Sequence, residues 1–245
     1  MSAFVFGSKL DLLVLLYDTT TGALIEERNI VFKRDGLPVR PEFRAAGTYI
    51  FINTGREDFL MRIEIPGYEV YECRVCYEEL DERIPECDVF LMPSENISRG
   101  NVLSFSGTLP FLKKVEAVRL SMPVCQFHEY NKKNSILLVF GNSSGTANLS
   151  NKYYGILRED KMSYEKIEVE KRISPLSVRL KEPLQEEFAS NLPIMRVIFG
   201  YVAEDGRYLL RVRDDGGDSR YLVRYEVNEE VKFQVVDFLS QEGLN

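Results

Sequence analysis

The chain contains no tryptophan and a single histidine among its 245 residues. Hydrolytic triads need a histidine, or an equivalent base, beside a nucleophile. The one histidine, His128, stands in an aromatic and polar segment without the sharp turn that presents a nucleophile. We therefore expect no catalytic residues, although a dyad of Cys125 and His128 stays open as an alternative. The missing tryptophan also argues against a site that stacks sugars, unless tyrosine or phenylalanine takes its place.

Net positive charge and long apolar runs are also missing. The formal net charge is −7, whereas binding to a phosphate backbone relies on clustered Lys and Arg, so we expect no nucleic acid partner. Near the N-terminus the apolar runs are broken by Gly7, Lys9 and Asp11, and no basic leader precedes them. We expect no signal peptide and no membrane span, and hence a cytoplasmic protein that is either free or incorporated into a particle.

The pattern of cysteines gives little support for a metal site. Cys73 and Cys76 have the spacing of zinc ligands, but they lie in a strand-like run in which residues three apart face opposite ways. No second pair of this kind follows. We expect no metal and no cofactor, with zinc left as an open alternative to free, partly buried thiols.

Two turns contain residue types that are found in ligand sites. Gly141–Gly145 lacks the Lys and Ser/Thr that a phosphate-binding loop needs. Asp214, Asp215 and Asp218 can supply oxygen ligands for calcium, but Asp-Gly pairs are also ordinary turn chemistry. Calcium binding there stays open.

The region from Gly47 to Tyr68 organises the first half of the chain. Apolar residues occupy every second position of its second strand: Phe59, Met61, Ile63 and Ile65. This period of two is typical of a half-buried strand. Thr54-Gly55 precedes it, so we predict a hairpin whose strands cover Gly47–Asn53 and Phe59–Ile65.

Other strands follow from short apolar runs bounded by turn residues. We predict strands over 10–17, 24–32, 68–77, 87–92, 102–109, 115–120, 135–140, 194–201, 207–213, 220–227 and 231–238, with an Asp35-Gly36 turn and a short helix over Pro183–Ser190. The fold class is all-β, with two antiparallel β-rich domains. Because Ser94–Gly100 is short and polar, the domains are 1–95, a β-sandwich, and 96–245, an irregular sandwich or barrel with the one short helix.

Arginine and tyrosine alternate near the C-terminus of this acidic chain. The residues are Arg207, Tyr208, Arg211, Arg213, Arg220, Tyr221, Arg224 and Tyr225. Both residue types are enriched at protein interfaces, so these eight are candidate partner-binding residues. The alternative is a solvated sheet face with ion pairs to Glu226 and Asp218.

Residues 10–93 resemble the carboxypeptidase regulatory-like, transthyretin-like superfamily of β-sandwiches. The resemblance rests on Asp18…Gly22, Val31-Phe32…Asp35-Gly36, Gly47-Thr48-Tyr49-Ile50-Phe51, Arg62-Ile63-Glu64-Ile65, Pro66-Gly67-Tyr68 and Val89-Phe90-Leu91. It implies a scaffold rather than an enzyme. The whole chain is also similar to uncharacterised components of bacterial phage-tail-like contractile injection systems, through Phe51…Phe59, Asp81-Glu82-Arg83 and Leu91…Asn96.

These observations predict a non-enzymatic structural or adaptor protein that contacts other protein subunits, further copies of itself included, in a larger bacterial assembly. The alternative is a carbohydrate- or peptide-binding module. Its ligand would lie on the loop Gly141–Ser150 or on the Arg/Tyr strands.

Overall fold

The computed structural model describes residues 9–44, 47–94, 102–141, 147, 149–214 and 216–240. The chain divides into two compact units. Unit 1 comprises Met1–Asp18 and Leu24–Ser98, and unit 2 comprises Thr19–Ala23 and Arg99–Asn245. Most of the predicted connection Ser94–Gly100 lies outside the described residues. No helix in the described part of the chain has the length and apolar character needed to cross a membrane.

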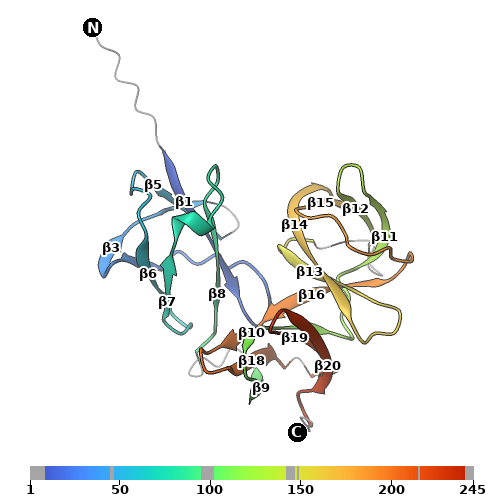
Figure 1. The fold of residues 1–245 in the computed structure, drawn as a ribbon. Coiled ribbons are helices and arrows are strands. Elements are labelled where there is room, and N and C mark those ends of the chain that lie inside the picture. The colour runs from blue at the N-terminus through green and yellow to red at the C-terminus, as the bar shows by residue number, and fades with distance from the viewer. Residues whose placement is uncertain are drawn as a thin grey trace. The chain divides into compact units, whose positions relative to one another are not determined.

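Unit 1 is a sandwich of two four-stranded sheets (Figure 1). One sheet has the order β4 (Glu42–Arg44), β5 (Thr48–Ile52), β1 (Leu10–Asp18), β8 (Glu86–Leu91), and the other β3 (Leu37–Val39), β2 (Val31–Arg34), β6 (Phe59–Glu64), β7 (Tyr71–Val75). Alternate residues of these strands form one buried cluster, which includes Leu12, Val14, Phe32, Phe51, Met61 and Ile63. The expected period of two therefore marks the core-facing side of each sheet.

The predicted hairpin over Gly47–Ile65 is wrong. Strand β5 pairs with β1 and β4, whereas β6 pairs with β2 and β7, so the chain crosses from one sheet to the other between them. The buried Asp11 carboxylate fixes this crossing, because its Oδ2 accepts hydrogen bonds from the backbone N–H groups of Thr54 (2.5 Å) and Gly55 (3.0 Å). Both strands show the alternation of a half-buried strand, which does not distinguish a hairpin from two strands that face each other across a core.

Two other details of unit 1 differ from the prediction. Strand β8 pairs with β1 in parallel, although only antiparallel pairing was expected. The strand predicted over 24–32 is reduced to an isolated bridge at Leu24 and to β2, which begins at Val31. The predicted turn at Asp35-Gly36 is confirmed: β2 and β3 pair antiparallel, and both turn residues have positive φ.

Unit 2 contains a closed barrel of six strands. Their order is β11 (Cys125–Asn131), β12 (Ile136–Phe140), β15 (Ser177–Leu180), β14 (Tyr164–Ser174), β13 (Tyr153–Leu157) and β16 (Pro193–Phe199), and β16 pairs back to β11. The interior is filled by side chains that include Phe127, Leu137, Tyr154, Ile156 and Val178. A barrel of this size holds a packed core rather than a channel.

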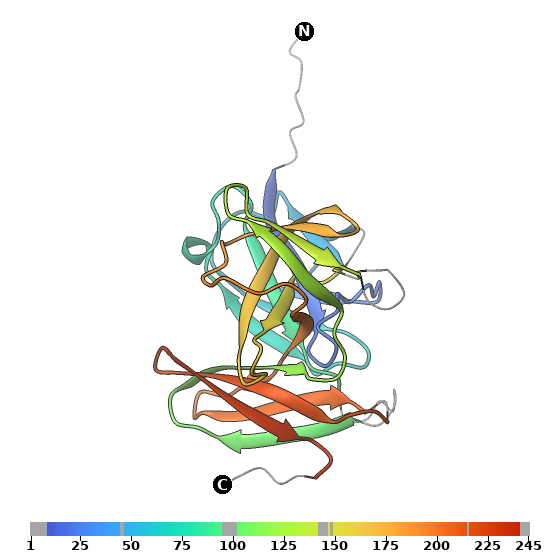
Figure 2. The same cartoon turned by 90° about the vertical axis from the view of Figure 1, so that its right-hand side faces the viewer.

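Strand β16 also continues the barrel wall into a second layer. It is followed by β10 (Leu112–Arg119), β19 (Arg220–Val227) and β20 (Glu230–Asp237). A three-stranded sheet of β17 (Tyr201–Val202), β18 (Arg207–Arg213) and β9 (Val102–Thr108) packs on them, and Figure 2 shows the two layers. Unit 2 thus combines a barrel and a small sandwich that share β16.

Two predictions for unit 2 are corrected. The turn residues Asp214–Asp218 between Arg207–Arg213 and Arg220–Val227 indicate a meander of neighbouring strands. Strands β18 and β19 do not form one, because β18 pairs with β17 and β9 whereas β19 pairs with β10 and β20. No helix forms over Pro183–Ser190. Leu184 and Phe188 instead pack against the barrel core from an irregular segment. A helix over so short a segment would form too few hydrogen bonds to offset the cost of nucleation.

Candidate functional site

The three tyrosines of the candidate partner-binding set lie inside the small sandwich. Tyr208, Tyr221 and Tyr225 are each less than a tenth exposed. The rings of Tyr208 and Tyr225 meet edge to face at 5.6 Å, and burial raises the pKa of Tyr225 well above its usual range. These side chains build the hydrophobic core, so little of their surface is available to a partner.

The five arginines of the set have separate environments. Arg207 pairs with Asp205 (2.6 Å) and Arg220 with Asp218 (2.7 Å). Arg224 bonds the buried Glu116 at 3.1 Å and lies 3.7 Å from Glu226. The ion pairs of the alternative interpretation, to Glu226 and Asp218, are thus present. Two members remain: Arg211 is buried, and Arg213 is exposed at the end of β18.

Arg213 and Tyr221 line a pocket in unit 2 of about 750 Å³. Two further arginines from other strands, Arg119 of β10 and Arg196 of β16, also line it. The rest of the lining is Thr20, Thr21, Ser121, Met122, Pro123, Val124, Cys125, Gln126 and Ile198. Among the described residues, the lining of this cavity therefore includes three arginines and no Asp or Glu. All of its lining residues belong to unit 2.

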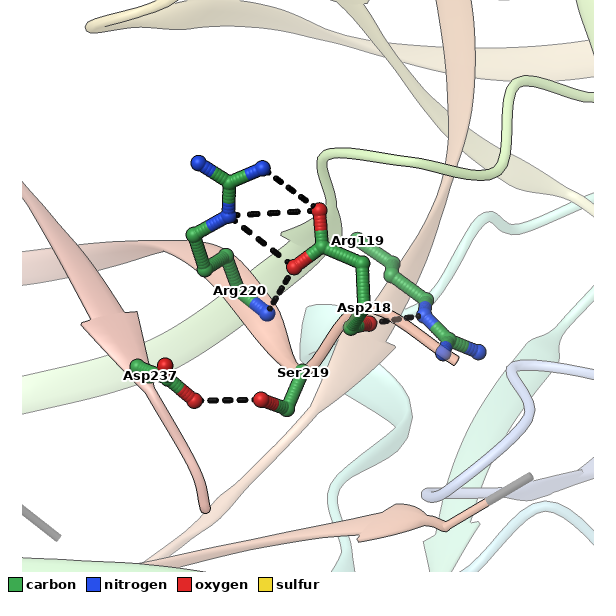
Figure 3. A network of polar contacts seen from close by, with 5 residues as sticks. All are labelled: Arg119, Asp218, Ser219, Arg220 and Asp237. Atoms are coloured by element: carbon green, nitrogen blue, oxygen red, sulfur yellow. Dashed lines mark hydrogen bonds and ion pairs between the residues drawn. The ribbon is translucent and has the colours of Figure 1, made fainter. Parts of the chain in front are cut away.

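A polar network at the start of β19 positions Arg119 (Figure 3). Arg119 Nε donates to the backbone carbonyl of Asp218 at 2.8 Å. The Asp218 carboxylate accepts from the backbone N–H and the guanidinium of Arg220, while Ser219 Oγ donates to Asp237. The hydrogen bond from Arg220 holds the pKa of Asp218 near 2. The backbone carbonyl of Asp218, which accepts from Arg119, is thus held in place by the side-chain hydrogen bonds of Asp218 and of the next residue, Ser219.

Arg196 lies beside the Thr19–Ala23 segment. Its Nη1 is 3.4 Å from the Thr21 carbonyl, and its Nε is buried without a hydrogen-bond partner among the described residues. The hydroxyl of Thr19, in the same segment, is also buried without a hydrogen-bond partner among the described residues. Gly22 allows the close approach of this segment to β16: it has a φ of +62°, and a Cβ there would lie 2.4 Å from the Val197 carbonyl oxygen.

A second notable feature of unit 2 is the edge strand β20. It pairs with β19 along all of its 8 residues and ends the nine-stranded sheet. Val231 and Val235 on one face are 43% and 38% exposed. Phe233 lies between them and contacts the ring of the buried Tyr164 at 5.3 Å. The sheet therefore ends in a long strand with apolar side chains at its surface.

The other candidate residues do not meet in a site. His128 is exposed and rests on Phe140, whereas Cys125 is buried in the barrel core and burial raises its pKa to about 12. Cys73 packs with Cys87 against the core of unit 1, and all four cysteines are free thiols.

No group of three or more potential metal ligands forms among the described residues. Asp215, one of the three aspartates weighed for calcium, lies outside them, as do residues 142–146 and 148 of the loop Gly141–Ser150.

The sequence was also compared with known proteins. No family model matches it, and no curated protein does. The arguments for function therefore rest on this chain's own geometry.

Sequence reasoning identified part of the pocket. Arg213 and Tyr221 were singled out as interface-type residues, but Arg119 and Arg196 were not. Each is a lone cation in a β-strand, and no spacing along the chain signals that these arginines converge. They share one pocket because β10, β16 and β18 each contribute an arginine to its lining.

Proposed function

We propose that this chain is a non-enzymatic structural or adaptor protein that holds another protein subunit by adding a strand of that subunit to the edge of β20. The single observation that supports this role is the length and apolar character of that edge. An edge strand presents a row of backbone donors and acceptors, which an extended segment of a partner can pair with. Natural proteins usually shorten such edges or protect them with charge.

The side chains of β20 suit this mode of binding. Val231, Phe233 and Val235 lie on one face at alternate positions, so an added strand can pack its own alternate residues beside them. Lys232 points to the other face and lies 3.8 Å from Glu230. A single lysine gives an edge strand of eight residues little protection against the addition of another strand. The exposed valines favour contact with a partner over contact with water.

The larger setting is also part of the proposal. We infer a cytoplasmically assembled bacterial particle, with a phage-tail-like contractile injection system as the assembly that the sequence resemblance points to. Unit 1 would be its transthyretin-like scaffold domain. Support comes from the motif order in residues 10–93 and from the sandwich of two four-stranded sheets in unit 1.

A purification of the native protein tests the adaptor role. Tagged wild-type chain and a Val231→Glu/Val235→Glu variant would each be isolated gently from the source cells, followed by mass spectrometry and size analysis. We expect the wild type to carry one or more subunits in fixed ratio and the variant to lose them. The matched control is Val70→Glu in unit 1, at a valine that is 54% exposed outside any strand.

The outcome that rejects the adaptor role is a wild-type chain that elutes alone as a monomer. A complex that survives in the Val231→Glu/Val235→Glu variant would instead reject β20 as the contact. Circular dichroism of the variant checks that the fold is kept, since both valines are at the surface.

A further inference from the structure

We propose that Cys73 and Cys87 form a thiol–disulfide site, which joins the two sheets of unit 1 when the protein meets a small disulfide oxidant such as oxidised glutathione. The site lies within unit 1 and does not depend on the proposed adaptor role of β20. It is assigned from the place of the two strands in the sandwich, the direction of the two side chains and the contact between their thiols.

The first argument is the place of the two strands. Strand β7 ends one sheet of unit 1 and β8 ends the other, and the two edges lie side by side (Figure 1). They are joined at one end by the antiparallel bridge between Tyr68 and Pro93, next to which the Glu69 N–H donates to the Met92 carbonyl at 2.8 Å. In the described part of the chain β7 and β8 form no ladder beyond this bridge. The two edge strands therefore run past each other without backbone pairing.

Each cysteine lies at a similar distance from that bridge. Cys73 follows Tyr68 by five residues, and Cys87 precedes Pro93 by six. Because extended residues advance by nearly equal steps, the two cysteines come to a similar height on the neighbouring edges.

The second argument is the direction of the side chains. Cys73 lies two residues before the buried Val75, and Cys87 two residues before the buried Val89, so each shares a core-facing side of its strand. Both cysteines pack against the core cluster of unit 1. Cys76 is three residues from Cys73 in extended backbone, so its side chain faces the other way. The partner of Cys73 is therefore Cys87 rather than the nearest cysteine in the sequence.

The third argument is the contact between the two thiols. The sulfur of Cys73 is hydrogen-bonded by the Cys87 thiol and by the Tyr71 hydroxyl. The bond from Cys87, followed by that from Tyr71, lowers the pKa of Cys73 against the opposing effect of burial, whereas the bond to Cys73 and burial raise the pKa of Cys87. The thiolate is the form that attacks a disulfide. Both residues are partly exposed, so a small disulfide can reach Cys73 as the attacking thiol and Cys87 can resolve the product.

The exchange takes place in two steps. The Cys73 thiolate attacks one sulfur of oxidised glutathione, which forms a mixed disulfide and releases the first glutathione. The Cys87 sulfur then loses its proton and attacks the Cys73 sulfur, which forms the Cys73–Cys87 disulfide and releases the second glutathione. Two protein thiols are oxidised, one glutathione disulfide is reduced, and the two thiol protons end on the two glutathione molecules. Reduced glutathione in excess reverses the reaction.

Oxidation of the reduced full-length chain tests the site. The protein would be incubated with excess oxidised glutathione at neutral pH, its remaining thiols blocked with N-ethylmaleimide in urea, and its peptides analysed by mass spectrometry without reduction. We expect two peptides linked through Cys73 and Cys87, with maleimide on Cys76 and Cys125. The matched control is Cys76→Ser, which should form the same link.

Two variants test the roles of the two thiols. Cys87→Ser lacks the resolving thiol, so it should keep glutathione attached to Cys73. Cys73→Ser lacks the attacking thiol and should carry roughly tenfold less glutathione on Cys87. Oxidation should raise the Tm of unit 1 in the wild type by roughly 8 °C or more, because the link restricts the unfolded chain, and should not raise that of Cys87→Ser.

The proposal is overturned if the wild type forms no link between Cys73 and Cys87, or if Cys73 becomes linked to Cys76 instead. As much glutathione on Cys87 in Cys73→Ser as on Cys73 in Cys87→Ser would overturn the assignment of Cys73 as the attacking thiol.

Discussion

Removing the carboxylate of Glu116 should destabilise unit 2 more than removing any surface carboxylate. Glu116 is 1% exposed on β10. It bonds Lys166 of β14 and, at 3.1 Å, Arg224 of β19, so it joins a barrel strand to the sheet of the small sandwich. Glu116→Gln keeps the shape of the side chain but removes the counter-charge of Lys166 and leaves Arg224 with only its longer contact to Glu226.

The magnitude follows from the burial of the two cations. Breaking a buried ion pair by removing one partner costs about 3–5 kcal/mol. The Lys166 and Arg224 side chains are 26% and 16% exposed, so water still reaches part of each charge. We therefore expect the low end, a loss of about 3 kcal/mol in the free energy of unfolding of unit 2. This corresponds to a fall in Tm of about 6–12 °C for a domain of this size.

Urea and thermal unfolding measure this loss. The chain has 13 tyrosines and no tryptophan, so tyrosine fluorescence and circular dichroism are the suitable signals. The matched control is Glu64→Gln in unit 1, whose ion pairs with Lys33 and Arg62 are exposed to water and should contribute much less to stability. The triple variant Glu116→Gln/Lys166→Met/Arg224→Met should recover most of the loss, because no buried charge is left unpaired. A Glu116→Gln variant as stable as the Glu64→Gln control would refute the reasoning.

Three further predictions concern single residues. Asp11→Ala should lower the free energy of unfolding of unit 1 by about 2 kcal/mol in urea, because two backbone N–H groups lose a charged acceptor; no change would mean that the crossing between β5 and β6 does not need this carboxylate. The folded pKa of Asp218 is lowered to about 2 by Arg220, so its contribution to stability is present above a pH of about 4 and is lost as the pH falls through 2; Asp218→Asn should remove that part of the dependence of Tm on pH between 2 and 5, and a profile that keeps its shape would contradict this. Burial raises the folded pKa of Cys125 to about 12, so its thiol contributes stability below the unfolded pKa of about 8.5, and this contribution is lost as the pH rises toward 12. At pH 8 the Cys125 thiol should therefore react with maleimide only when urea unfolds the chain. Prompt labelling of Cys125 in the folded chain, read by peptide mass, would contradict its burial.

Strand positions were largely predictable from the sequence, whereas strand neighbours were not. Arg207–Arg213 and Arg220–Val227 were placed at the bounds that β18 and β19 have. The alternation of apolar and polar residues shows which side of each strand is buried. That side faces the core whether two consecutive strands form a hairpin or lie in opposite sheets of a sandwich, so the alternation does not reveal which strands pair. The same limit explains why β5 and β6 were paired although they belong to opposite sheets.

The barrel strands were the hardest to find. Strand β14 is buried at Tyr164 and Ile167 but exposed from Glu170 to Ser174, so its second half has no apolar alternation. Strand β11 combines buried Cys125 and Phe127 with exposed polar residues, and a register shift interrupts its pattern. Closure of six strands is a property of the long-range pairing, which one sequence does not reveal.

The candidate site was predictable only in composition. Of the eight Arg and Tyr residues, Arg213 and Tyr221 line the pocket. The burial of Tyr208 and Tyr225, however, depends on which face of each strand packs inward. Charge reversal at Arg211 or Arg224 would consequently test the fold, because the first is buried and the second bonds Glu116.

The account's central claim, that a partner adds a strand to β20, is tested most directly by hydrogen exchange. Amide exchange over residues 230–237 would be followed by mass spectrometry in the isolated chain and in the assembly purified from its own cells. Strand addition predicts that protection of β20 rises by roughly tenfold or more in the assembly, because the outward-facing amides gain partners. Unchanged protection of β20 in an intact assembly would contradict the claim and place the contact elsewhere on the chain.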